Sequence, residues 1–197
     1  MFSVVLFSLK KHHLATDRII LGIDPGTNIM GYGLIHQQGN VIRLITMGVL
    51  KLAKYDNHPL KLKKIFERTV GLIEEYHPDE MALEAPFFGK NVQSMLKLGR
   101  AQGVAMAAGL HKNVPIFEYS PKKVKMSVVG NGSASKEQVA AMLKTILNFK
   151  DIPKYLDATD GVAVAVCHFF QGDKPSTDNK SYNSWKSFIS ENPNRTK

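Results

Sequence analysis

Cysteine is almost absent from this chain of 197 residues, since Cys167 is the single one. One cysteine excludes a disulfide within the chain and a zinc site built on a cysteine cluster. It also favours a reducing compartment, so we expect a cytoplasmic protein. Apolar runs are short, and none approaches the roughly 20 residues that a membrane-spanning helix requires. The apolar opening MFSVVLFSL precedes the first lysines, whereas a secretory signal carries its charges in front.

Acidic residues are outnumbered, because 17 Asp and Glu stand against 26 Lys and Arg, which leaves a net charge of +9. Such a balance favours an acidic partner, most often nucleic acid, and the alternative is a charge kept for solubility. The length predicts one domain. We expect it to span residues 18–172, with residues 1–17 as a disordered N-terminal extension and residues 173–197 as a polar, mobile tail.

The stretch RIILGIDPGTNIMGYG, residues 18–33, opens this domain. Its apolar run ends at Asp24 and a Pro-Gly pair follows, which predicts a buried strand and then a turn. A carboxylate at the end of a buried strand needs a cation, a dense set of hydrogen bonds or solvent. Asp24 is therefore a candidate metal ligand, and the alternative is that it only begins a type I turn.

Two further strands follow this turn. We expect the first over residues 29–35, where Gly31 and Gly33 are small enough for another backbone or a ligand to come close. The Gly-Asn pair at 39–40 predicts a hairpin into a strand over residues 41–50. Three strands joined by tight turns make an antiparallel meander.

The remaining segments alternate between helical and strand patterns. Apolar spacing predicts helices over residues 59–77, 91–110, 136–147 and 157–170, and strands over residues 81–84 and 115–119. Ser135 with Gln138 forms a capping box before the third helix. The small residues of helix 91–110 permit close approach of another helix, from the domain's own core or from a second subunit. The pattern is that of an α/β chain with a mixed sheet, in which parallel strands join the meander and helices flank it.

Four acidic residues stand where structure alone does not require an acid: Asp24, Glu84, Asp157 and Asp160. The first two end apolar strands and the last two open an apolar helix, so they can converge, and they repel unless cations lie among them. Oxygen ligands without a His or Cys cluster suit Mg²⁺ or Mn²⁺ rather than zinc. A pair of such ions about 4 Å apart is the usual device for phosphodiester hydrolysis. For the helical pair, the alternative is capping favoured by the helix dipole.

Basic and aromatic residues between these acids are candidates for contacts with nucleic acid. Two phenylalanines, Phe87 and Phe88, closely follow Glu84; they can stack on bases or wedge between them, and the alternative is a place in the core. Lysines and arginines contact phosphates without reading sequence, and the alternative is a solvated face. The candidates are Lys90, Lys97, Arg100, Lys112, Lys122, Lys123, Lys125 and Lys136.

Five motifs occur in a specific order: LGIDPGT followed by GYG, ALEAPFFGKN, LKLGRAQGVA, EYSPKKVKMSVVGNGSASKEQV and DATDGVAVAVCH. In this combination the chain resembles RuvC-type Holliday junction resolvases over about residues 18–170. The resemblance implies a ribonuclease-H-like fold and a homodimer. Each subunit would nick one of two opposed strands of a four-way DNA junction with Mg²⁺, in recombination and repair.

The resemblance also assigns roles to matching positions. It implies that helix 91–110 forms the dimer, that Phe87 stacks near the crossover, and that Lys125 and Lys136 approach the DNA backbone. It further implies a branch-migration partner, made of a junction-binding protein and a ring motor. The catalytic and metal-binding acids would be Asp24, Glu84, Asp157 and Asp160, with two Mg²⁺ ions for which Mn²⁺ can substitute.

The chain departs from the family pattern in two places. Ala85-Pro86 stands where a more polar pair is expected, and Gly161 stands where Ala is more usual. Glycine within a helix costs about 1 kcal/mol relative to alanine. Two other functions are open to the residues alone. One is a phosphotransferase of the sugar-kinase and actin type, against which the short chain without an internal repeat argues. The other is a junction-binding protein without catalysis, whose acids are only caps and turns.

Overall fold

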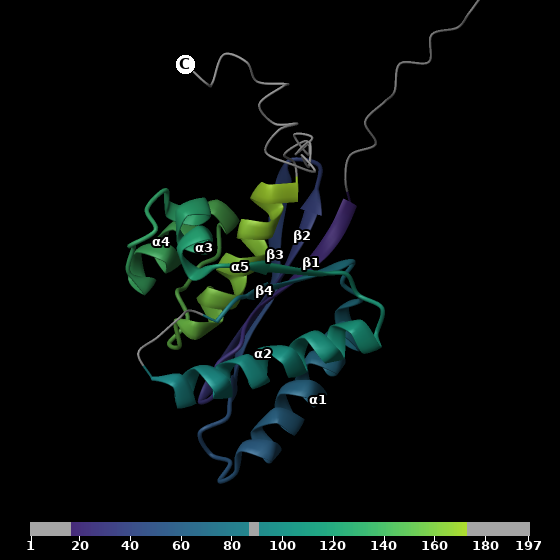
Figure 1. Cartoon of the computed structure of the whole chain (residues 1–197). Helices are drawn as coiled ribbons and strands as arrows, with labels where there is room; N and C mark the ends of the chain where they lie inside the picture. Colours follow the sequence, from purple (N-terminus) through teal and green to yellow (C-terminus); the bar gives the residue numbers. More distant parts are fainter. Residues whose placement is uncertain (1–16, 87–90, 173–197) are drawn as a thin grey trace, which may run out of the picture.

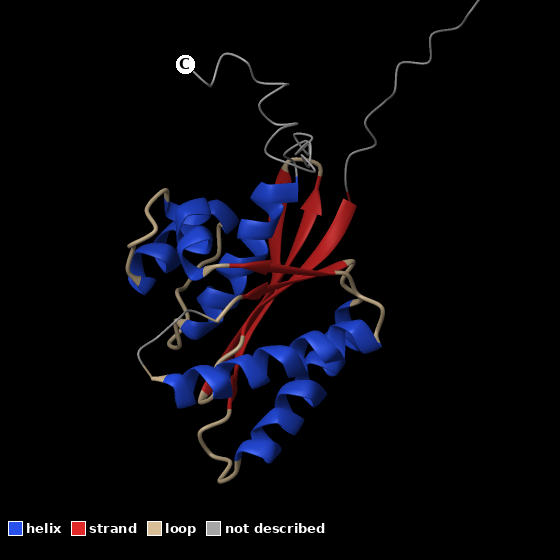
Figure 2. Ribbon diagram, in the orientation of Figure 1, coloured by secondary structure: helices blue, strands red, loops and turns tan. Residues whose placement is uncertain are grey.

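The computed structural model describes residues 17–86 and 91–172, which form a five-stranded sheet with helices on both faces (Figure 1). Its strands lie in the order β3-β2-β1-β4-β5, and Figure 2 shows them as the central layer. In chain order the elements are β1 (Asp17–Asp24), β2 (Ile29–Gln38), β3 (Val41–Lys51), α1 (His58–Tyr76), β4 (Glu80–Glu84), α2 (Val92–His111), β5 (Ile116–Tyr119), α3 (Pro121–Val129), α4 (Lys136–Leu147) and α5 (Asp157–Gly172).

The sheet is mixed, as the sequence predicts. Strands β1, β2 and β3 form the antiparallel meander, whereas β4 pairs parallel with β1 and β5 pairs parallel with β4. Strand β1 begins at residue 17, one residue before the expected domain boundary, and α5 ends at residue 172. Asp17, expected to belong to a disordered extension, instead pairs in β1, and residues 1–16 and the expected C-terminal tail lie outside the described residues.

One helix, α3, was not predicted from the sequence. It is only nine residues long and buries only Val124 and Val128, so its apolar period is too brief to detect. The residues at its two ends are nevertheless typical of helix caps. Ser120 caps the helix by accepting a hydrogen bond from the Lys123 backbone, a proline follows at the first position, and Gly130 ends it with φ 78°. The predicted capping box at Ser135 before α4 is confirmed.

Alternate residues of the strands face opposite layers of helices. Leu21 and Ile23 of β1 pack on the side of α1 and α2, and Ile20 packs on the side of α3, α4 and α5. Because side chains of a strand alternate with a period of two, Asp24 shares the face of Ile20. The same reasoning puts Glu84 of β4 on that face, since it lies two residues beyond Ala82.

Helix α5 lies directly against the backbone of β1 and β2. A Cβ atom added at Gly31 would lie 1.8 Å from the Asp157 carbonyl oxygen, and one at Gly22 would lie 2.2 Å from the Gly161 carbonyl oxygen. Conversely, a Cβ atom at Gly161 would lie 2.5 Å from the Tyr32 Cα atom. The expected close approach at Gly31 is thus that of a second backbone. Glycine at position 161 has a packing reason here, despite its cost to helix propensity.

The small residues of α2 serve two different surfaces. Ala101, Ala105 and Ala108 are buried in the domain, where α2 packs against α1. Added Cβ atoms at Gly99 and Gly103 would meet nothing within 4 Å. The domain's own core therefore accounts for the alanines and not for these two glycines. Within residues 17–86 and 91–172, no helix combines the length and the apolar character needed to cross a membrane.

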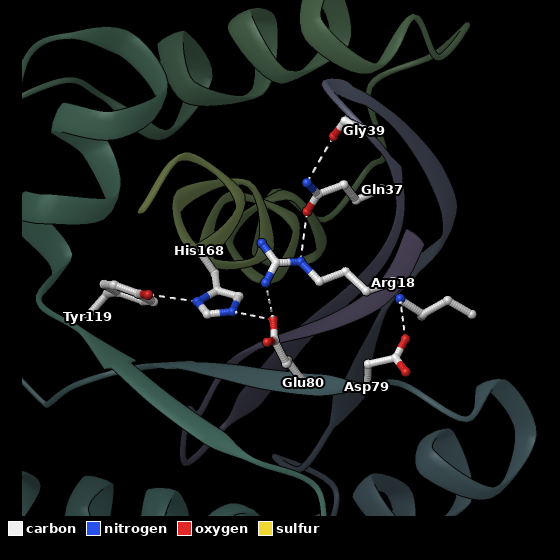
Figure 3. A network of polar contacts seen from close by, with 8 residues as sticks. Arg18, Gln37, Gly39, Asp79, Glu80, Tyr119 and His168 are labelled. Atoms are coloured by element: carbon white, nitrogen blue, oxygen red, sulfur yellow. Dashed lines mark hydrogen bonds and ion pairs between the residues drawn. The ribbon is translucent and has the colours of Figure 1, made fainter. Parts of the chain in front are cut away.

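A buried polar network ties α5 to the sheet along its C-terminal half (Figure 3). His168 Nε2 lies 2.7 Å from Glu80 Oε2, and His168 Nδ1 lies 2.7 Å from the Tyr119 hydroxyl. Arg18 Nη1 donates to the same Glu80 oxygen over 2.8 Å, and Arg18 Nε donates to Gln37 Oε1 over 2.7 Å. Nε2 donates to Glu80, because a carboxylate oxygen only accepts, and burial lowers the pKa of His168, which favours the neutral ring with Nδ1 as the acceptor of the tyrosine hydroxyl.

Candidate active site

The carboxyl ends of β1 and β4 bring two of the predicted acids together. These strands are parallel neighbours, with Ile23 opposite Leu83, so Asp24 and Glu84 follow at the same edge of the sheet. Both line a cavity of about 210 Å³ that Asp160 of α5 also lines. Three separate segments thus supply carboxylates to one cavity. The sequence alone predicts that these carboxylates converge only on the assumption that β1 and β4 are parallel neighbours.

The other two acids lie in the first turn of α5. Lys136, the first residue of α4, joins them, because its Nζ lies 3.2 Å from Asp157 Oδ1 and 2.5 Å from Asp160 Oδ2. The side chains of Asp157 and Asp160 are 31% and 15% exposed, so this lysine neutralises a partly desolvated pair. The close contact of Gly161 with β2 fixes where this turn of α5 lies. The structure therefore places Asp24, Glu84 and Asp160 on one cavity, and Lys136, which also lines it, joins Asp157 to this group.

Desolvation and mutual repulsion perturb these acids strongly. Burial, then the neighbouring Asp160, raises the pKa of Asp24 to about 7. Burial, then the neighbouring Asp24, raises the pKa of Glu84 to about 8. Burial also raises the pKa of Asp160, against the lowering effect of its hydrogen bond to Lys136. Burial alone would lower the pKa of Lys136, but its contacts with Asp160 and Asp157 raise it overall.

The donor set fits a hard divalent cation. Among the described residues, no three His, Cys, Asp or Glu side chains already stand together as a formed set of metal ligands. The lysine ammonium instead lies between Asp157 and Asp160, as the counter-charge of that pair. Burial, then repulsion between neighbouring acids, raises the pKa values of Asp24 and Glu84 to about 7 and 8, and a divalent ion bound among them would offset that repulsion. Oxygen donors alone favour Mg²⁺ or Mn²⁺ over zinc.

The predicted basic residues fall into separate places. Lys125 lines the acidic cavity together with Lys136. Lys122 and Lys123 do not line it, because they lie on another side of α3. There they line a cavity of about 630 Å³ with Phe170, and the Lys123 ammonium lies 5.3 Å from the centre of the Tyr119 ring.

The remaining candidates lie on α2 or outside the described residues. Lys97 lines a cavity at the start of α2, and Arg100 is exposed one turn later. Lys112 at the other end of α2 pairs with Glu74 at 2.6 Å, so its charge is already matched. Phe87, Phe88 and Lys90 lie outside the described residues. Sequence reasoning missed His58 and Lys61, which share the cavity of Lys97, because a helix start with a lone histidine carries no recognisable spacing.

A second cavity, of about 190 Å³, extends the site towards α2. Asp24 and Glu84 line it on one side, and Leu98 and Gln102 of α2 line it on the other. Gln102 also donates to Glu118 Oε1 over 2.5 Å. The Ala85-Pro86 pair, which departs from the expected sequence, lies in this lining.

Comparison with known proteins agrees with this geometry. The family model for crossover junction endodeoxyribonuclease RuvC matches residues 20–168. The crossover junction endodeoxyribonuclease RuvC of Cytophaga hutchinsonii is 66% identical over 182 residues, which cover 92% of this chain and 89% of that protein. The RuvC of Christiangramia forsetii is 61% identical over 188 residues, covering 95% of this chain and 97% of that protein.

A solved structure has the same fold. T. thermophilus RuvC in complex with a Holliday junction substrate superposes with a TM-score of 0.73 at 30% sequence identity, over 79% of this chain and 94% of that one. The resemblance and the ribonuclease-H-like fold predicted from the sequence are thereby confirmed. The matched region contains all four acids, both lysines of the acidic cavity, strands β2 to β5 and most of β1. The chain belongs to the RuvC family of crossover junction endodeoxyribonucleases.

Proposed function

We propose that this protein is a metal-dependent endonuclease that resolves four-way DNA junctions by paired nicking during recombination and repair. The single observation that carries the proposal is the gathering of Asp24, Glu84, Asp157 and Asp160 with Lys136 at one edge of the sheet. Membership of a family of crossover junction endodeoxyribonucleases supplies the reaction class. The relative solved with a Holliday junction supports the choice of substrate.

The four acids would hold two Mg²⁺ ions, with Mn²⁺ able to substitute. When bound, the ions supply an activated water and charge stabilisation at the leaving oxygen. The chain's own residues prepare the place for them. Parallel pairing of β1 with β4 sets Asp24 beside Glu84, and the glycine contacts of α5 set the other two acids against them. Lys136 and Lys125, in the same cavity, would hold the phosphate backbone at the site.

A homodimer through α2 would match two active sites to two opposed strands. A stripe on this helix supports it, because Val92, Leu96 and Leu110 are 66%, 51% and 62% exposed, and Gly99 and Gly103 open to space between them. These positions repeat at intervals of three, four and seven residues, which keeps them on one face. Phe87 and Lys90, which precede α2 in the sequence, would contact DNA near the crossover. A branch-migration complex would be the partner in the bacterial cytoplasm, where the chromosome lies.

Cleavage of a synthetic immobile four-way junction tests the proposal directly. We expect Mg²⁺-dependent nicks in two opposed strands of the junction and none in a linear duplex of the same sequence. Asp157→Asn should bind the junction and not cut it. Asp151→Asn is the matched control, because Asp151 is exposed and takes no part in the ion pairs of Lys136 with Asp157 and Asp160.

Two results would contradict the proposal. Cutting by Asp157→Asn at the wild-type rate would show that these acids take no part in the cleavage reaction. Tight binding with no cutting, on junctions with varied central sequences, would instead favour the alternative of a junction-binding protein without catalysis.

A further inference from the structure

A second charged cavity, of about 310 Å³, lies apart from the four acids. The turn between β1 and β2 forms one wall through Thr27 and Asn28, and the starts of α1 and α2 form the others. Its lining is almost wholly polar: Thr27, Asn28, Asp56, His58, Lys61, Ser94 and Lys97. The reaction proposed above gives this cavity no role.

The cavity carries an excess of unmatched positive charge. Lys61 and Lys97 line it, and Arg100 lies near enough to act on the histidine in the lining. None of these three cations forms an ion pair within residues 17–86 and 91–172, although other lysines on the same helices pair with acids. The one acid of the lining, Asp56, is exposed to solvent. Cations gathered without partners around a polar cavity are suited to an anion.

His58 provides an unused hydrogen-bonding group in the same place. Its Nε2 atom is buried and has no hydrogen-bond partner in the described part of the chain. Burial, then the positive charges of Arg100, Lys97 and Lys61, lowers the pKa of this histidine. A buried polar atom without a partner is costly, and an acceptor oxygen bound at this cavity would satisfy Nε2 in the tautomer that carries the proton there.

The two helix starts add to the positive potential. Asn57 caps α1 and Asn91 caps α2, and each asparagine satisfies one backbone N–H of its helix. Neither helix has an acidic residue in its first turn, where an acid would be favourable. The positive ends of both helix dipoles are therefore left for an external anion.

We propose that this cavity binds a backbone phosphate of the DNA strand that continues from the acidic cavity. The same turn connects the two places, because Asp24 and Pro25 line the acidic side and Thr27 and Asn28 line this one. Helix α2 also spans both, through Leu98 on one side and Lys97 on the other. The ligand is a phosphodiester, held by charge and by His58 Nε2. This inference rests on the proposed function and adds a contact some way from the reacting phosphate.

Replacing Lys61 tests the site with a matched control on the same helix. Lys61→Gln removes a charge from the cavity, and Lys63→Gln removes one from a side chain that is 68% exposed and lies beside Glu67. Residues two apart on a helix point in different directions, so the control keeps the cavity intact. The measurement is the affinity for a fluorescent four-way junction without Mg²⁺ at several salt concentrations.

We expect Lys61→Gln to bind several-fold more weakly and to lower the slope of log affinity against log salt by about 0.9, as for one lost phosphate contact. Lys63→Gln should keep the wild-type slope. Lys61→Arg should restore the slope, which a purely structural role of the lysine would not require. Thermal unfolding of each variant checks that the fold is intact.

The outcomes separate this inference from the proposed function. If the wild type binds the junction and both glutamine variants share its slope, the phosphate site is refuted and the nuclease proposal stands. If the wild type binds the four-way junction no more tightly than linear duplex, the proposed function itself is refuted. A second readout is the ¹⁵N resonance of the His58 ring, which should shift when the junction binds to wild-type protein. An unmoved resonance would count against the contact at Nε2.

Discussion

Replacing Asp24 by asparagine should stabilise the metal-free protein while it abolishes cleavage. Asp24 is an acid whose folded-state pKa, about 7, lies above its ordinary value of 3.8. For such a group the ionised form is disfavoured in the folded state. The wild type therefore loses stability as pH rises from about 4 to about 7, and the loss is complete above that range.

The size of the effect follows from the pKa difference. Each unit corresponds to about 1.4 kcal/mol, so the rise from 3.8 to about 7 sets an upper limit of about 4 kcal/mol. Glu84 faces the same repulsion and shares the available protons, so we expect a measured gain of about 2 kcal/mol. For a domain of this size, that gain corresponds to a rise in Tm of about 4–8 °C.

Thermal unfolding in EDTA at pH 5 and at pH 8 measures this gain. Asp24→Asn should be the more stable protein at pH 8, and the advantage should shrink at pH 5. Asp151→Asn should match the wild type at both pH values, since its side chain is exposed. Mg²⁺ should then stabilise the wild type more than Asp24→Asn, because the variant lacks one carboxylate of the metal site. A variant no more stable than the wild type at pH 8 would refute the reasoning.

Three further predictions follow from the packing and the polar contacts. Gly31→Ala should destabilise by about 3 kcal/mol in urea unfolding, because its Cβ would overlap the Asp157 carbonyl oxygen. Gly71→Ala, on α1 where an added Cβ meets no other atom, should instead stabilise by up to about 1 kcal/mol. Lys136→Gln should reduce the cleavage rate by at least about tenfold in single-turnover assays, while the affinity for the junction falls far less. Equal losses of cleavage rate and of junction affinity would contradict a role of Lys136 at the reacting phosphate. His168→Phe should lower the free energy of unfolding by about 2–4 kcal/mol in thermal unfolding, since it leaves the buried Tyr119 hydroxyl without its hydrogen-bond partner. An unchanged stability would show that the network in Figure 3 adds little to the free energy of unfolding.

Local patterns predicted most of the elements. The meander, the capping box at Ser135 and the helix that begins at Asp157 follow from turn residues, caps and apolar spacing, which act within a few residues. Helix α3 was missed because its two buried valines are too few to establish a period. The expected ends of several elements differ from the observed ones by one to three residues, because terminal turns fray and carry little apolar signal.

The acids themselves could be singled out from the sequence, because each stands next to an apolar run where an acid is costly. Their convergence could not be derived from spacing alone. It depends on β1 lying next to β4 and on α5 resting against Gly31 and Gly33, which are contacts between distant parts of the chain. The basic residues show the same limit. Lys122, Lys123 and Lys125 are close in sequence, yet only Lys125 lines the acidic cavity.

The sequence by itself determined the type of most elements, the family and the four candidate acids, because these rest on local propensity and on motif order. Only the tertiary structure decided which charges meet. It paired Lys112 with Glu74, set Lys136 between two acids, and left Lys61 on the cavity that His58 also lines. The physical reason is that an electrostatic interaction depends on distance and on burial, and both are properties of the folded chain.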